Sequence, residues 1–278
     1  MSNPISDPLV ENVIVDDLST VSLQATPEGV AVVTLNRPEK KNAFDTTMIE
    51  GLTEAFETLQ GADHVRVVFL RGAGGTFCAG ADLEWMALAA EMTEDDNRSD
   101  AMTVANMLKA LADIPAVTVA LVEGAALGGG AGLVAACDLA VAVDGARFSF
   151  SEVKLGLIPA MIAPYVVEAI GPRTARGLFV TGRSFDAREA LKIGLVNEVV
   201  EGTEGLAAAE ERIATEVMAA APGAVVEAKS LAREVAGREI DHSLMLETAR
   251  RLARRRVSDE GREGVSAFLQ GRKPDWIG

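Results

Sequence analysis

A glycine-rich stretch follows an apolar run in the middle of the chain. Residues 124–132 read GAALGGGAG, directly after the apolar run 117–122. A strand, a glycine turn and a helix in this order leave unpaired backbone N–H groups at the helix N-terminus, where negative charge is favoured. The spacing matches neither the dinucleotide fingerprint nor the phosphate loop. The stretch therefore predicts a site for a negatively charged oxygen, or else close packing of a helix on a strand.

A second glycine-containing turn, residues 72–83 (GAGGTFCAGADL), also follows a buried run. Two such turns can each direct one N–H group at the same oxygen, which is the geometry of an oxyanion hole. Asp82 lies within this turn, and its position is typical of a helix N-cap or a turn anchor rather than of a catalytic acid.

A single carboxylate, Glu152, lies in the largely apolar segment 148–159. Removal from water would raise the pKa of this carboxyl group and suit it to proton transfer near neutral pH. The alternative is a surface glutamate paired with Lys154 or Arg147. The spacing alone leaves both interpretations open.

The elements that must position these segments begin with a hairpin and a helix. Residues 21–23 and 30–35 are expected to form antiparallel strands on either side of a Pro-Glu-Gly turn. Asp45 is a good N-cap for a helix that Gly61 ends. The apolar stripe of this helix is expected to consist of Met48, Leu52, Phe56 and Leu59.

Strands and helices alternate through the first part of the chain, which indicates an α/β fold. Apolar runs at 65–70, 117–122 and 139–143 predict buried strands. After Pro159 helical periodicity dominates. A capping-box spacing starts at Asp186, Gly194 is placed to end that helix, and amphipathic stretches cover 206–221, 225–235 and 240–257.

No repeat, low-complexity tract or long linker marks a separable second domain. We therefore divide the chain into a flexible N-terminal arm (1–17), an α/β core (18–200) and a helical C-terminal region (201–278).

Composition excludes several classes of protein. The 278 residues carry 26 Lys and Arg against 41 Asp and Glu, which gives a net charge of −15, and the mean hydropathy is +0.20. This acidity argues against nucleic-acid binding, which depends on Lys and Arg, and the arginines at 250–256 suit a solvated or inter-subunit face. No signal peptide and no membrane-spanning apolar segment is visible, which predicts a cytoplasmic protein without membrane contact.

Cysteine and histidine are too few to build a metal centre or a disulfide framework. Cys78 and Cys137 lack the spacing of metal ligands, and His64 and His242 have no serine or cysteine motif around them. We expect small buried thiols and no metal.

Four segments together resemble the enoyl-CoA hydratase/isomerase (crotonase) superfamily. Residues 35–43 (LNRPEKKNA) are similar to its N-terminal CoA-binding motif, and residues 77–83 to its first oxyanion-hole loop. Residues 115–138 resemble its glycine signature, and residues 263–274 its C-terminal tail. The resemblance runs from about residue 18 to residue 276 and implies an α/β crotonase-type spiral of ββα units with a helical C-terminal region.

The resemblance implies a role for individual residues. The N–H groups of Ala81 and Gly129 would hold the thioester oxygen of an acyl-CoA substrate, and Glu152 would move the proton. Contacts with CoA would come from Lys40, Lys41, Ala43, Ala79, Asp82, Leu83, Phe268 and Lys273. No separate cofactor is expected, because CoA is part of the substrate. The C-terminal region would assemble homotrimers or dimers of trimers.

One position departs from the family's two-glutamate hydratases, because Gly132 stands where their first glutamate would be. Isomerases of the family can use the second glutamate alone. Residues 151–167 are similar to hydratases of methylglutaconyl-CoA and isohexenylglutaconyl-CoA, a branch that also lacks the first glutamate. We therefore predict a hydratase of a 2-enoyl-CoA. The alternatives are a Δ3-Δ2-enoyl-CoA isomerase that uses Glu152 and a non-catalytic CoA-binding or RNA-associated scaffold.

Gly132 itself carries two expectations. A glycine there would leave room for a larger acyl chain. Introducing a glutamate at this position would place a second carboxylate at the site and raise the hydration of crotonyl-CoA.

Overall fold

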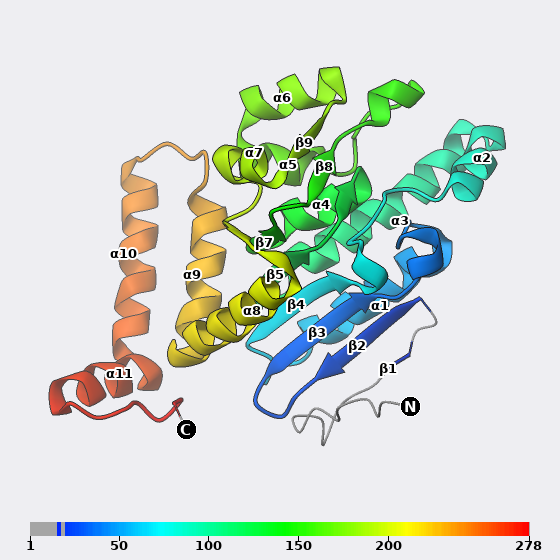
Figure 1. Ribbon diagram of the computed structural model, residues 1–278. Helices are drawn as coiled ribbons and strands as arrows, with labels where there is room; N and C mark the ends of the chain where they lie inside the picture. The colour runs from blue at the N-terminus through cyan, green and yellow to red at the C-terminus, as the bar shows by residue number, and fades with distance from the viewer. Residues whose placement is uncertain (1–15, 18–19, 278) are drawn as a thin grey trace, which may run out of the picture.

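A seven-stranded sheet forms the centre of the computed structural model, which describes residues 16–17 and 20–277 (Figure 1). Its strands are β1 (Asp16–Asp17), β2 (Val21–Ala25), β3 (Val30–Leu35), β4 (Val67–Gly72), β5 (Val117–Val122), β7 (Leu139–Val143) and β10 (Glu198–Val200). They lie in the order β1-β2-β3-β4-β5-β7-β10, antiparallel from β1 to β3 and parallel from β3 to β10. The parallel strands all end at one edge, and the loops that follow β4 and β5 leave from there.

Helices cover both faces of this sheet (Figure 1). α1 (Thr46–Gln60) and α3 (Glu94–Ala112) pack together on one face, and α8 (Gly202–Ala219) crosses the other. The first four residues of β4 are all buried, as expected for a parallel strand that is covered on both sides. The expected hairpin is confirmed, and the strand expected over 65–70 begins two residues later.

The first helix forms as its sequence predicts. The Asp45 side chain accepts a hydrogen bond from the Met48 N–H over 2.8 Å, which satisfies one of the unpaired donors at the start of α1. The expected apolar stripe is buried, and Gly61 ends the helix.

A smaller sheet lies beside the first and consists of β6 (Ala125–Leu127), β8 (Arg147–Ser149) and β9 (Ser184–Asp186). It packs among α4 (Gly129–Ala136), α5 (Ala163–Ile170), α6 (Pro172–Thr181) and α7 (Ala187–Ile193). The Asp186 side chain caps α7 by accepting from the Glu189 N–H over 2.8 Å, which confirms the capping box, and Gly194 ends this helix in the left-handed conformation. The three-residue strands β9 and β10 were missed, because so short a run has no readable period.

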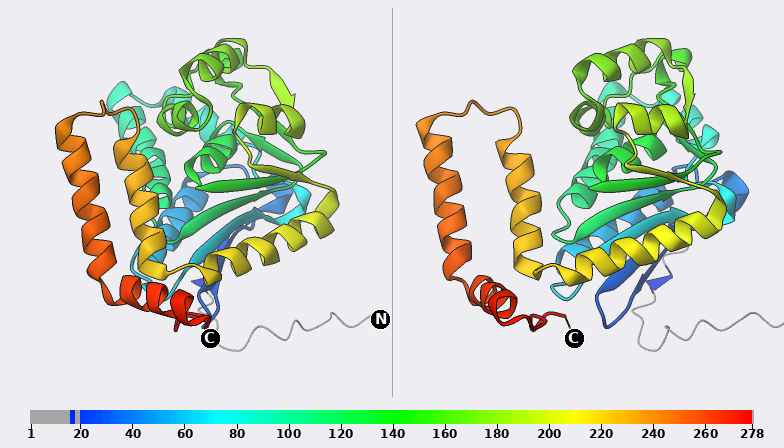
Figure 2. Two further views of the ribbon diagram at one scale, coloured as in Figure 1. Left: turned by 90° about the vertical axis from the view of Figure 1, so that its left-hand side faces the viewer. Right: turned by 60° about the vertical axis from the view of Figure 1, so that its left-hand side comes forward.

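Three helices, α9 (Pro222–Val235), α10 (His242–Val257) and α11 (Asp259–Gln270), complete the chain. α9 lies between α10 and the main sheet, and α10 stands away from the rest of the molecule (Figure 2). The expected helices over 225–235 and 240–257 are confirmed to within three residues.

Most of the expected N-terminal arm lies outside the described residues. Asp16 and Asp17 are described, and they pair antiparallel with β2 instead of belonging to an arm. The other boundaries, at residues 200 and 201, remain predictions.

Candidate active site

Two loops carry Ala81 and Gly129, and backbone pairing aligns them. The Cys78 N–H donates to the Ala125 carbonyl over 2.9 Å, and the Leu127 N–H donates to the Cys78 carbonyl over 2.9 Å. These bonds join Cys78 in parallel to the central residue of β6. Ala81 lies three residues beyond Cys78, and Gly129 lies three residues beyond its partner. Parallel pairing therefore carries both residues to the same end of the two loops.

The N–H group of Ala81 is directed away from the neighbouring backbone. The Phe44 N–H donates to the Gly80 carbonyl over 2.7 Å, and the Asp82 N–H donates to the Phe44 carbonyl over 2.7 Å. In such a bridge the residue between the two bonds directs its own N–H to the opposite side. Ala81 therefore donates to no protein acceptor within residues 20–277. Gly80 has a φ of 95°, which favours glycine, and it turns the chain at this point.

The N–H group of Gly129 is the first of helix α4. The helix starts after Gly128, which has a φ of 50°, and the Gly132 N–H donates to the Gly128 carbonyl over 3.0 Å. The N–H groups before Gly132 have no partner inside the helix. A Cβ on Gly129 would lie 2.5 Å from Cε2 of Phe44, so only glycine fits against this ring. Phe44 thus contacts both loops, a role that no sequence pattern revealed.

Glu152 lies beside the same helix N-terminus, at the start of the 3-10 helix η3 (Glu152–Leu155). Its Oε1 is 3.2 Å from the position that a Cβ would take on Gly128, and its Oε2 is buried with no hydrogen-bond partner in the described part of the chain. Burial raises the pKa of Glu152 above its ordinary value, and a hydrogen bond within its own residue lowers it in part. Burial is the largest cause of the shift and Oε2 has no partner within the described residues, which contradicts the interpretation as a surface glutamate paired with Lys154 or Arg147.

Ile162 fills the space beside Gly132, one turn into α4. A Cβ on Gly132 would lie 2.1 Å from Cγ2 of Ile162 and 2.8 Å from its Cβ. Ile162 is 3% exposed and belongs to the hydrophobic core. The expectation that Gly132 leaves room for a larger acyl chain is therefore wrong, because an isoleucine side chain occupies that room.

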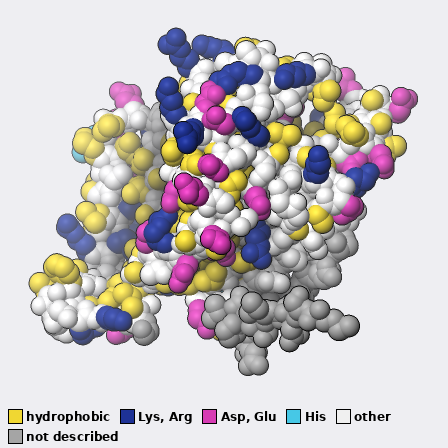
Figure 3. All heavy atoms as spheres, in the orientation of Figure 1, with side chains coloured by type: hydrophobic (Ala, Val, Ile, Leu, Met, Phe, Trp, Pro, Cys, Tyr) yellow, Lys and Arg dark blue, Asp and Glu magenta, His cyan; other side chains and the backbone are white. Residues whose placement is uncertain are grey.

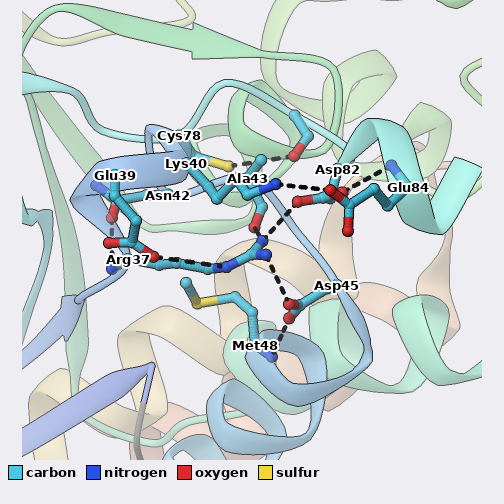
Figure 4. A network of polar contacts seen from close by, with 11 residues as sticks. Arg37, Glu39, Lys40, Asn42, Ala43, Asp45, Met48, Cys78, Asp82 and Glu84 are labelled. Carbon is cyan, nitrogen blue, oxygen red and sulfur yellow. Dashed lines mark hydrogen bonds and ion pairs between the residues drawn. The ribbon is translucent and has the colours of Figure 1, made fainter.

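Arg37 is the centre of a polar network that joins the segment after β3 to the loop of Ala81 (Figure 4). Its Nη1 donates to Asp82 Oδ2 over 2.8 Å and to the Ala43 carbonyl over 3.2 Å. Its Nη2 lies 3.2 Å from Asp45 Oδ2. Asp82 also accepts from the Glu84 N–H over 2.8 Å, which confirms it as the N-cap of α2 (Leu83–Glu91).

Asn42 adds a second tie between the same segments. It is fully buried, and its Nδ2 donates to the carbonyls of Ala73 and Thr76 over 2.9 and 2.7 Å. Its Oδ1 accepts from the Arg37 N–H over 2.9 Å. The pattern N-R-P-E-K-K-N-A carried the signal for both residues but suggested contacts with CoA alone.

The predicted CoA contacts divide into two groups. Lys40, Lys41, Ala43, Ala79 and Leu83 lie on the segments that frame the two loops, together with Asp82. Lys40 is ion-paired with Glu84 over 3.0 Å, whereas Lys41 is exposed and its carbonyl accepts from the Ala79 N–H over 3.0 Å.

Phe268 and Lys273 form the other group. Phe268 lies on α11, is 84% exposed, and belongs with Lys273 to the end of the molecule opposite α2 (Figures 1 and 2). A single chain therefore does not bring these two residues to the site.

The described residues contain no group of three or more His, Cys, Asp or Glu side chains arranged to hold a metal ion. None of the described helices is long and apolar enough to cross a membrane.

Known proteins match this chain over most of its length. A family model described as enoyl-CoA hydratase/isomerase matches residues 25–278. The enoyl-CoA hydratase structure from Shewanella pealeana is 37% identical with a TM-score of 0.89 and covers 94% of this chain and 97% of its own. Pseudomonas aeruginosa AtuE is 38% identical with a TM-score of 0.89 over 93% and 100%. The enoyl-CoA hydratase AKT6-1 of Alternaria alternata is 32% identical over 88% of this chain and 80% of its own.

The fold and these matches define an α/β enzyme that acts on enoyl-CoA thioesters. The chain belongs to the enoyl-CoA hydratase/isomerase (crotonase) superfamily.

Proposed function

We propose that this enzyme adds water to a 2-enoyl-CoA with Glu152 as its single acid–base group. The N–H groups of Ala81 and Gly129 would hold the thioester oxygen. The observation that carries the proposal is the position of Glu152 against Gly128, next to the first free N–H of α4. This position puts the Glu152 carboxyl group beside one of the two N–H groups of the proposed oxyanion hole.

The reaction balances with this one carboxylate. Glu152 accepts a proton from water while the hydroxide oxygen bonds to C3, and the electrons of the C2–C3 double bond move onto the thioester oxygen. The N–H groups of Ala81 and Gly129 stabilise the resulting enolate, as donors in an oxyanion hole do. The protonated Glu152 then returns its proton to C2, which restores the thioester and the carboxylate. Burial prepares this group for both steps, because it raises the pKa of Glu152 toward the working pH.

Ile162 supports a site with a single carboxylate. It excludes any side chain at Gly132, so the chain has no second acid at that place on α4. The resemblance of residues 151–167 to hydratases of methylglutaconyl-CoA favours an acyl group that carries its own carboxylate, as in 3-methylglutaconyl-CoA. The carboxylate of such a substrate can help to orient the water.

A second function is favoured by the electrostatics around Glu152. Burial is the largest cause of the shift in its pKa, and apolar Ile162 packs against Gly132, one turn into α4. Apolar surroundings of this kind favour an uncharged acyl chain over an acidic one. The same geometry suits a Δ3-Δ2-enoyl-CoA isomerase, in which Glu152 removes a proton from C2 of a 3-enoyl-CoA and returns it to C4.

The two functions are separated by product analysis in H₂¹⁸O. We expect 3-hydroxyacyl-CoA that carries ¹⁸O, with 3-methylglutaconyl-CoA hydrated faster than crotonyl-CoA. Rapid conversion of 3-enoyl-CoA to 2-enoyl-CoA with no ¹⁸O in any product would overturn the hydratase and establish the isomerase. Absence of both reactions would overturn the proposed role of the site.

We also propose that CoA is held between two copies of the chain. Lys41 is exposed beside the loop of Ala81 and suits the CoA phosphates. Phe268 and Lys273 reach a site only from a neighbouring copy, since their own site lies at the other end of the molecule. A homotrimer or a dimer of trimers, assembled through the C-terminal helices, would supply that neighbour.

A further inference from the structure

Two helices start next to the bridge between Phe44 and Ala81, and an aspartate caps each of them. Asp45 Oδ1 accepts from the Met48 N–H at the start of α1, and Asp82 Oδ1 accepts from the Glu84 N–H at the start of α2, both over 2.8 Å. Each carboxylate therefore uses one oxygen to cap its helix. The other oxygen, Oδ2 in both cases, remains available for a second partner.

Arg37 forms ion pairs with both of these remaining oxygens. Its guanidinium lies 2.8 Å from Asp82 Oδ2 and 3.2 Å from Asp45 Oδ2, and it donates to the Ala43 carbonyl over 3.2 Å. The planar fork of an arginine can satisfy several acceptors in fixed directions, which a lysine cannot do. The three acceptors belong to residues on either side of Phe44 and to the residue after Ala81 (Figure 4).

The Arg37 side chain is 15% exposed and that of Asp82 is 4% exposed, so water screens the pair little. Burial raises the pKa of Asp82, but the hydrogen bonds from the Glu84 N–H and Arg37 and the charge of Arg37 together lower it below its ordinary value. Loss of the guanidinium would leave a buried carboxylate without its partner, which favours protonation or displacement of the loop.

We propose that Arg37 is a positioning residue, which fixes the N–H of Ala81 in the direction of the substrate by linking the caps of α1 and α2. This inference rests on the proposed function, since it assigns the Ala81 N–H to the thioester oxygen. It also removes Arg37 from the cations available to CoA phosphates, because its donors are engaged inside the protein.

The test compares Arg37→Met with Arg66→Met. Arg66 donates to the carbonyls of Val217 and Ala220 at the opposite end of β4, so its replacement removes a structural arginine away from the site. We expect Arg37→Met to lower kcat about 10- to 100-fold, in the range of losses from misplaced oxyanion donors, with KM for the acyl-CoA changed by less than about threefold. Arg66→Met should keep kcat within about twofold of the wild type, even if its Tm falls by as much as the Tm of Arg37→Met.

A spectroscopic measurement reads the position of the N–H group without turnover. The absorption of bound cinnamoyl-CoA moves to longer wavelength when its thioester oxygen is hydrogen-bonded, because polarisation of the carbonyl extends into the conjugated system. We expect this shift in the wild type and in Arg66→Met, and a much smaller shift in Arg37→Met at saturating ligand. Asp82→Asn should reproduce the smaller shift, since asparagine still caps α2 but cannot pair with Arg37.

A full shift and a kcat within twofold in folded Arg37→Met would overturn the positioning role. A raised KM with unchanged kcat and shift would make Arg37 a CoA-binding residue instead. If Arg37→Met does not fold, Asp82→Asn takes its place, and a full shift in that variant overturns the proposal. A wild type that binds cinnamoyl-CoA without a shift would overturn the oxyanion hole itself, whereas a normal shift without hydration would overturn only the proposed reaction.

Discussion

The surroundings of Glu152 oppose its ionisation. Its Oε2 is buried and has no partner in the described part of the chain, and burial raises its pKa. The folded protein therefore binds this proton more tightly than the unfolded chain does. The stability that this provides is present at low pH and is lost as the pH rises through the raised folded pKa. Above this folded pKa the protein carries a carboxylate whose burial lowers its stability.

Replacement of Glu152 by glutamine should separate chemistry from stability. The amide keeps the size of the side chain but cannot accept and return a proton, and general acid–base groups contribute about 10²- to 10⁴-fold to a rate. We expect turnover to fall by that amount, acyl-CoA binding to stay nearly unchanged, and Tm at neutral pH to stay equal or rise. Retention of more than about a tenth of the wild-type rate would remove Glu152 from the mechanism.

The pH dependence should show the same group. Glu152 must be ionised to accept a proton, so kcat/KM should fall at low pH with a midpoint above 4.5, the ordinary value from which its pKa is raised. Glu152→Gln should lack this limb in its residual rate. A wild-type midpoint at or below 4.5 would show that the free enzyme holds this carboxylate without the cost of burial.

Substitutions at Gly132 and Ile162 should have non-additive effects on the free energy of unfolding. A methyl group on Gly132 would overlap Ile162, and overpacking of a core costs about 1 to 3 kcal/mol. We expect Gly132→Ala to destabilise the protein by this amount, and less in an Ile162→Ala background, as measured by denaturant unfolding at fixed protein concentration. Equal losses in both backgrounds would show that the two positions do not interact.

The same contact corrects the expectation for Gly132→Glu. This single variant should gain no hydration of crotonyl-CoA, since Ile162 occupies the place of its side chain. A double variant with Ile162→Gly has the room for the carboxylate, and its rate is the proper comparison.

Two loops, each followed by a helix, carry the N–H groups of Ala81 and Gly129. Ala81 and Gly129 provide only backbone groups, so the elements around them, rather than their side chains, determine what they can bind. β6 aligns the two loops, and Gly80 turns the first so that the N–H of Ala81 leaves its bridge with Phe44.

Proline at position 81 should remove one donor of the proposed oxyanion hole. Because proline has no N–H, we expect Ala81→Pro to lower kcat about 10²- to 10³-fold. Ala81→Gly is the matched control, since it keeps the N–H and should stay within a few-fold of the wild type. Circular dichroism must show a native spectrum for both variants, and a folded Ala81→Pro with full activity would make this loop purely structural.

The elements differ in how far the sequence could predict them. Long periodic elements such as α1, and apolar runs such as β5 and β7, were predictable because burial imposes a pattern on many residues at once. The loops of Ala81 and Gly129 and the carboxylate Glu152 were identifiable from glycine spacing and from an isolated charge. The proximity of the two loops depends on the Cys78 bridge to β6, a pairing between residues nearly 50 positions apart that leaves no local pattern.

Contacts made by side chains were the least predictable. Ile162 against Gly132 and Phe44 against Gly129 involve apolar residues that look like any other core position in the sequence. Arg37 is a charged residue after a strand, where exposure is the ordinary expectation, and only the fold places two aspartates within its reach.

The molecule exposes an apolar surface at its C-terminal end. α10 and α11 expose large apolar side chains, and apolar atoms gather over this end in the space-filling view (Figure 3). The exposed residues are Met245, Leu246, Leu252, Val257, Val265, Phe268 and Leu269. Surfaces of this kind on one region of a protein are typical of contacts between subunits.

Charges on α10 should therefore change the assembly. Met245 and Leu252 are each 53% exposed and lie on one face of the helix, since seven residues make nearly two turns. We expect Met245→Glu with Leu252→Glu to shift the protein from trimer or hexamer to monomer in sedimentation experiments, with a loss of CoA binding. Arg254→Glu, on the opposite face, is the control. A wild type that sediments as a monomer would contradict the proposed assembly.

The thiol of Cys78 lies between the two loops, and this position makes it a reporter of their separation. It is fully buried beneath Gly130, and burial raises its pKa to about 12. A thiol-specific reagent can modify it only after the loops part, so the rate of labelling in a Cys137→Ala background follows the opening equilibrium of this region. Bound acyl-CoA spans both loops in the proposed complex and should slow that rate in proportion to its saturation. The labelling rate of Cys78 thus measures how often the two loops of the site separate.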